Sequence, residues 1–143
     1  MELRNGIVAG LVAGLVMGVS LFIVGAFAAL AIYGPEFAPP GKFEPEQIDA
    51  WYFLWTKLVI GASFGVFFGI IYAKLYSSLR GDGVLKGLYY SFWMWLITYL
   101  WNISHSLVYG PFDITSNVFW LIYTLGGFLP YGTVLGYLCK RMK

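Results

Sequence analysis

Four long apolar stretches follow one another along the chain, separated by short polar segments. They run approximately over residues 6–33, 51–76, 83–109 and 117–139. Each can cross a bilayer, because a transmembrane helix needs about 20 mostly apolar residues. The apolar positions are continuous rather than alternating, which argues against barrel strands. Backbone groups in lipid must then be satisfied within each segment, so the pattern predicts four transmembrane helices in one all-α bundle.

The second half of the chain repeats the design of the first. The recurring pieces are GIVAGL at 6–11 and GVLKGL at 83–88, YGP at 33–35 and 109–111, and GxxxG at 65–69 and 132–136. We expect one membrane domain over 1–143, made of a helical hairpin at 4–78 and a second at 81–143. A two-helix repeat returns the chain to its starting side, so the hairpins should be related by a pseudo-two-fold axis along the membrane normal.

Composition leaves no room for a separate soluble domain. Of the 143 residues, 59% are hydrophobic and only 11% are charged, whereas a soluble domain carries about 25% charged residues. The first stretch is also longer than the 7–15 apolar residues or so of a signal peptide, so we interpret it as a retained helix.

The net charge is only +2, but its distribution predicts the orientation in the cell membrane. With both termini in the cytoplasm, that side holds Arg4, Lys74, Arg80, Lys86, Lys140, Arg141 and Lys143, and the outside holds only Lys42 and Lys57. Positively charged residues favour the cytoplasmic side. The outside would also hold five of the seven acids, namely Glu36, Glu44, Glu46, Asp49 and Asp113. The basic residues therefore serve topology, and nothing indicates a nucleic-acid partner.

Glycines recur at four-residue spacing on three of the predicted helices. They are Gly6, Gly10, Gly14 and Gly18 on the first, Gly61, Gly65 and Gly69 on the second, and Gly132 and Gly136 on the fourth. Such spacing lets another helix backbone approach closely. We expect these faces at the centre of the bundle with bulky aromatics around them, or in part at a homodimer interface. Pro130 should kink the fourth helix.

A set of polar residues forms the candidate site. Lys57 and His105 are the ionisable groups that lie within the spans and away from the cytoplasmic side, and such groups are functional candidates. Thr98, Asn102, His105 and Tyr109 follow helical spacing on one face of the third helix, in line with Ser91. One interpretation is an outward-opening polar cavity formed with Lys57. The other is that Asn102 and His105 bond to neighbouring helices while Lys57 extends to the headgroups.

Several chemistries lack the residues that they need. The chain has one histidine and one cysteine, so a zinc or iron site has too few ligands. No spacing indicates a nucleophile beside a base, and no glycine loop follows a strand to hold a phosphate. We therefore expect no cofactor or metal, and we do not expect an enzyme.

The helices resemble an uncharacterised family of small, glycine-rich, four-helix membrane proteins of bacteria and archaea. The pieces that carry the resemblance are Gly10-xxx-Gly14-xx-Met17, Ile60-Gly61-xxx-Gly65-xxx-Gly69-Ile70-x-Tyr72, Lys86-Gly87-Leu88-Tyr89 with Trp95, and Tyr131-Gly132-x-Val134-Leu135-Gly136. Members often carry a histidine in the second and fourth helices, where this chain has Lys57 and Phe128. The resemblance implies a fold and no established activity.

These features favour a non-enzymatic membrane protein that works through helix packing in the lipid bilayer. It would be a homo-oligomer or an accessory subunit of another membrane protein. The alternative is a small homo-oligomeric channel or transporter with an outward-facing polar site near His105.

Overall fold

The computed structural model describes residues 2–34, 50–109 and 113–142, and within them the chain is all-helical. Its four helices are α1 (Leu3–Tyr33), α2 (Ala50–Leu75), α3 (Gly83–Tyr109) and α4 (Ile114–Arg141). The side chain of Tyr109 and the predicted outer acids Glu36, Glu44, Glu46 and Asp49 lie outside the described residues.

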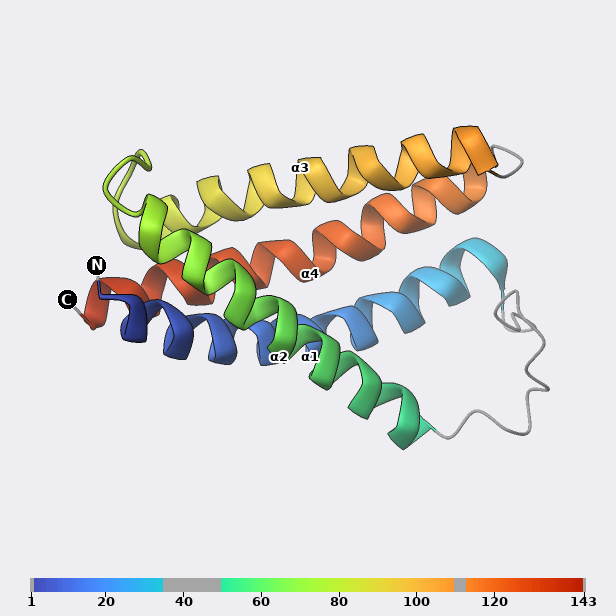
Figure 1. The fold of residues 1–143 in the computed structure, drawn as a ribbon. Helices are drawn as coiled ribbons and strands as arrows, with labels where there is room; N and C mark the ends of the chain where they lie inside the picture. The colour runs from blue at the N-terminus through green and yellow to red at the C-terminus, as the bar shows by residue number, and fades with distance from the viewer. Residues whose placement is uncertain (1, 35–49, 110–112, 143) are drawn as a thin grey trace.

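Successive helices run antiparallel, as Figure 1 shows. The start of α1, the α2–α3 connection and the end of α4 share one end, which we call the terminal end; the opposite end is the distal end. The Asn5 side-chain nitrogen donates to the Met142 carbonyl at 2.7 Å and ties α1 to α4 at the terminal end. Helix α1 packs along both α2 and α4, and α3 packs along α4. Towards the distal end, α2 diverges from the other three helices.

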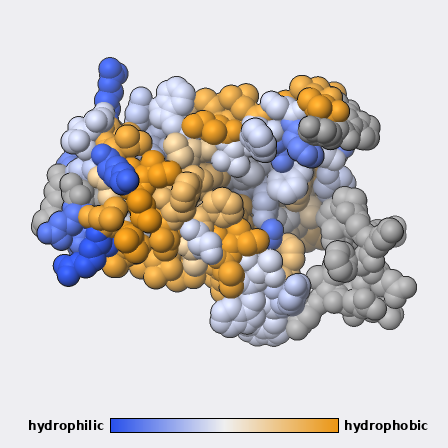
Figure 2. All heavy atoms as spheres, in the orientation of Figure 1, coloured by the Kyte–Doolittle hydropathy of each residue, from blue (hydrophilic) through white to orange (hydrophobic). Residues whose placement is uncertain are grey.

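Three of the four helices are long and apolar enough to cross a membrane, namely α1, α2 and α4. Helix α3 is as long as the others, but seven of its 27 residues are Trp or Tyr and it also carries Asn102 and His105. Figure 2 shows apolar side chains covering much of the face around α2, with hydrophilic side chains gathered at the terminal end. The described residues confirm a helical chain in which three helices could span a membrane; a fourth span through α3 remains a prediction.

Glycines bring the backbones of α1 and α2 into direct contact. A Cβ atom added at Gly65 would lie 2.6 Å from the Gly14 Cα and even closer to the Gly10 carbonyl oxygen. At Gly18, an added Cβ would lie 2.6 Å from the Lys57 carbonyl oxygen. Real side chains cannot occupy such positions, so this crossing requires glycine.

The α3–α4 hairpin is held in the same manner. A Cβ added at Gly87 would lie 2.6 Å from the Gly136 nitrogen and even closer to the Gly132 carbonyl oxygen. An added Cβ at Gly132 would collide with the Ser91 side chain. Both close contacts therefore lie within a hairpin, between its two helices.

The centre of the bundle combines the expected small residues, such as Ala9, Ala13 and the buried glycines of α1, with buried tyrosines, while many other aromatic side chains lie outside. The fully buried side chains include Tyr72, Tyr90 and Tyr131, packed with Leu135 and Cys139. The glycines bring helices together in pairs, and the space where the pairs meet needs large side chains to fill it. This core lies towards the terminal end, where Tyr72 and Cys139 are close to the ends of α2 and α4.

Asp113 caps the start of helix α4, and the helix continues through Pro130. The Asp113 carboxylate accepts hydrogen bonds from the backbone nitrogens of Thr115 at 3.2 Å and Ser116 at 2.8 Å, which makes it the N-cap. These bonds, chiefly from the Ser116 hydroxyl and backbone, hold the pKa of Asp113 below its ordinary value. Pro130 lies within α4, which continues through it to Arg141.

Candidate functional site

The predicted polar residues of α3 do not share one environment. Ser91 is buried against α4, whereas Thr98 and His105 are exposed and Asn102 is half-buried. The Thr98 hydroxyl donates to the Met94 carbonyl of its own helix at 2.8 Å. The polar face of α3 therefore points out of the bundle from Thr98 onwards.

Lys57 lies against α4. Its ammonium nitrogen is 4.9 Å from the centre of the Phe53 ring and 5.2 Å from the centre of the Tyr123 ring. A cation within about 6 Å of a ring face gains a favourable electrostatic contact. The structure thus brings Lys57 to an aromatic site between α2 and α4.

The distal half of α3, residues 92–108, is poorly covered in the described bundle. None of these residues, all of which the structure describes, is buried. Trp101 is 76% exposed and Ile97 is 59% exposed. Only the side of α3 that faces α4 is covered there; the Trp95 indole nitrogen donates to the Thr124 hydroxyl at 3.1 Å. An aromatic and polar surface remains open beside this contact.

Lys86 has a role that its charge alone did not indicate. We interpreted it as a topology determinant, yet it is only 9% exposed. Its ammonium donates to the Tyr76 carbonyl at 2.8 Å and lies 4.2 Å from the centre of the Tyr76 ring. Carbonyls just beyond a helix end have no partner in the helix, so Lys86 of α3 satisfies one past the end of α2. Its position one turn into α3, opposite that end, is the signal that could have shown this.

Two buried tyrosines join α3 and α4 to the backbone of α2. The Tyr90 hydroxyl donates to the Phe68 carbonyl at 2.8 Å, and the Tyr131 hydroxyl donates to the Gly65 carbonyl at 3.3 Å. Tyr72 packs its ring 5.1 Å from that of Tyr90, and its buried hydroxyl has no hydrogen-bond partner. Phenols and one amine offer hydrogen bonds that fix helix positions. They offer no carboxylate to act as a base.

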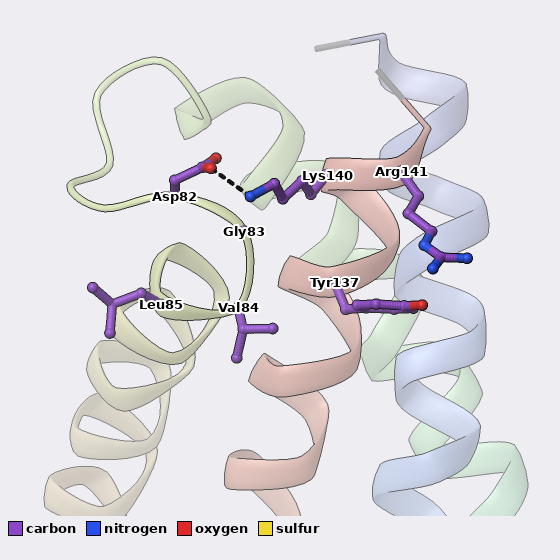
Figure 3. Close-up of a pocket in the computed structure, with 7 residues that line it drawn as sticks. All are labelled: Asp82, Gly83, Val84, Leu85, Tyr137, Lys140 and Arg141. Carbon is purple, nitrogen blue, oxygen red and sulfur yellow. Dashed lines mark ion pairs between the residues drawn. The ribbon is translucent and has the colours of Figure 1, made fainter.

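A hollow opens at the terminal end, between the start of α3 and the end of α4. Its volume is about 590 Å³, and its lining residues are Asp82, Gly83, Val84, Leu85, Tyr137, Lys140 and Arg141. Figure 3 shows Asp82 and Lys140 on the side of α4 that faces α3, Arg141 beside Tyr137 on the other side of α4, and Val84 pointing towards α4. Lys140 forms an ion pair with Asp82 at 2.8 Å. The Arg141 guanidinium lies 4.8 Å from the centre of the Tyr137 ring.

No family model, curated protein or solved structure matches the chain. The resemblance to the glycine-rich four-helix family therefore stays a prediction. Within the described ranges, no three His, Cys, Asp or Glu side chains gather in a way that could hold a metal ion.

Proposed function

We propose that the chain is a four-span integral membrane protein that acts without catalysis, through lateral helix packing, as a homo-oligomer or an accessory subunit. The docking surface is the distal half of α3. The observation that carries this proposal is that none of residues 92–108 is buried, although the segment carries Thr98, Asn102 and His105.

Polar groups at membrane depth are costly when they face lipid. Thr98 and His105 both lie on the exposed face of α3. Trp101 extends the same surface with a large aromatic side chain, a type that is enriched in protein interfaces. A partner helix would cover the polar groups and bury the ring at once.

The close-packing glycine surfaces are already occupied inside the chain. Gly10 faces Gly65 and Gly69 of α2, and Gly87 faces Gly132 and Gly136 of α4. A partner must therefore use another face, and the distal half of α3 is available.

The glycine contacts within each hairpin also support the proposed duplication. Under the sequence repeat Gly10 corresponds to Gly87, and the GxxxG pair at 65–69 corresponds to the pair at 132–136.

The channel or transporter alternative needs Lys57, Asn102 and His105 along one aqueous path. The cation of Lys57 lies against Tyr123 of α4, and His105 is exposed on α3. A path through the bundle needs these groups inside it, so the exposure of His105 favours assembly over transport.

Site-directed cross-linking in native membranes tests the proposal. In a Cys139→Ser background, single cysteines replace Thr98 and Trp101 on α3, and Val59 and Phe67 on the exposed face of α2 serve as matched controls. We expect a thiol cross-linker to produce a dimer, or an adduct with one stoichiometric membrane protein, from the α3 positions only. Equal products from both helices, or monomers throughout, would contradict the proposal.

The orientation of the chain in the membrane is tested with single-cysteine variants in the same Cys139→Ser background. Both termini are proposed to be cytoplasmic, since Arg4, Arg80 and Lys140 lie at the terminal end. A cysteine at Arg80 should react with an impermeant maleimide only after the cells are opened, and a cysteine at Asp113 should react in intact cells. The reverse pattern would overturn the orientation.

A further inference from the structure

We infer that the hollow between the start of α3 and the end of α4 binds the headgroup of an anionic phospholipid. Lipid binding here requires the chain to lie in a bilayer, as proposed above, but does not require lateral assembly through α3.

The charges of the hollow match a phosphate diester. Lys140 and Arg141 contribute two positive charges and Asp82 one negative charge, so the rim carries a net charge of +1. Asp82 accepts one hydrogen bond from Lys140, whose ammonium has two further donors. Arg141 extends over Tyr137 with a planar fork of donors that suits two phosphate oxygens.

The depth of the hollow fits the boundary between headgroups and acyl chains. Arg141 is the last residue of α4, and Tyr137 lies one helical turn, about 6 Å, further into the span. On the α3 side, Leu85 is 67% exposed and Val84 is 36% exposed, so apolar surface continues below the cations. A cationic rim over an apolar furrow is complementary to one lipid molecule: the phosphate at the rim and an acyl chain beneath it.

Glycine shapes the hollow. Gly83 lines the hollow, and an added Cβ there would lie 2.8 Å from the Lys140 Cδ, so the Lys140 side chain crosses the backbone of α3 at this point. Because Gly83 has no side chain, the Lys140 stem can reach across to Asp82 and hold its ammonium at the rim.

Native mass spectrometry of the full-length protein in detergent tests this site. Phosphatidylglycerol is titrated against phosphatidylcholine, and the first bound lipid is counted. We expect a preference for phosphatidylglycerol, and we expect Arg141→Gln to weaken the first binding event about tenfold, since it removes a charge-assisted pair. Lys74→Gln is the matched control, because Lys74 is an exposed cation in the last turn of α2, outside the hollow. Loss of the preference in both variants, or in neither, would overturn the inference.

A second variant separates a lipid from a free anion. Leu85→Gln should weaken phosphatidylglycerol binding several-fold while leaving the competition by inorganic phosphate unchanged. If inorganic phosphate displaces the lipid completely and Leu85→Gln has no effect, the hollow is a simple anion site and the lipid assignment is wrong. The same spectra also give the mass of the oligomer, which reports on lateral assembly. A failure of the lipid inference can therefore be distinguished from a failure of the proposed assembly.

Discussion

Gly65→Ala adds only one methyl group, but it should push α1 away from α2. The new Cβ would lie 2.6 Å from the Gly14 Cα and even closer to the Gly10 carbonyl oxygen, while ordinary contact begins at 3.4 Å, so the helices must part by at least about 0.8 Å at this level. Neither Gly14 nor Gly10 can move aside, since both contacts are with backbone. A gap of this size forfeits about a quarter to a half of each dispersion contact that it opens.

The expected cost follows from this geometry. Overpacking a tight site costs about 1–3 kcal/mol, and rigid backbone on the opposite side points to the upper figure. Alanine returns about 1 kcal/mol through its better helix propensity. We therefore expect Gly65→Ala to lower the free energy of unfolding by about 2 kcal/mol.

Cys139 provides the assay. Its side chain is 0% exposed, so a thiol-reactive fluorophore should label it only as the bundle opens on heating or in denaturant. Gly127→Ala is the matched control: its added Cβ would also lie 2.6 Å from a neighbour, but that neighbour is the end of the Leu21 side chain, which can rotate. The reasoning fails if Gly65→Ala is as stable as the original chain, or if Gly127→Ala is destabilised equally.

Three further predictions follow from single contacts. Tyr90→Phe should cost about 1 kcal/mol in denaturant unfolding because it removes the bond to the Phe68 carbonyl, whereas exposed Tyr89→Phe should cost little. Lys86→Met should cost about 2 kcal/mol by the same assay because the Tyr76 carbonyl loses a charged donor; a change no larger than that of exposed Lys74→Met would contradict this. Since the folded-state pKa of Asp113 is lowered, its cap should be fully present above the unfolded-state pKa near about 3.9 and lost as pH falls through the lower folded value. The protection factors of the Thr115 and Ser116 amides against hydrogen exchange should fall over that range, and Asp113→Asn should make these protection factors independent of pH.

The helices could be predicted closely from the sequence because long apolar runs leave few alternatives. The third was placed at 83–109 and is observed at Gly83–Tyr109. The fourth was placed at 117–139, yet it begins at Ile114, because Asp113 caps the helix before the apolar run starts. Capping by a polar residue is a local signal that the hydrophobic pattern does not contain.

The partners of the polar groups could not be predicted in the same way. Spacing places Thr98 and His105 on one face of a helix, but it does not say whether that face meets another helix. The burial of Lys86 depends on where α2 ends relative to α3, which is a tertiary distance. The buried tyrosines beside these small residues could not be predicted for a similar reason: the glycines show that helices pair, and the space between the pairs is fixed only by the packing of both hairpins.

The divergence of α2 gives the molecule unequal ends. The core that joins all four helices lies near the terminal end, and α2 leaves the bundle towards the distal end. In a bilayer such a shape displaces more lipid from one leaflet than from the other. A molecule that is wider at one end fits best in a curved membrane, where the leaflet around the wide end is stretched. We therefore expect the protein to be enriched in curved membrane. Its shape should also stabilise that curvature.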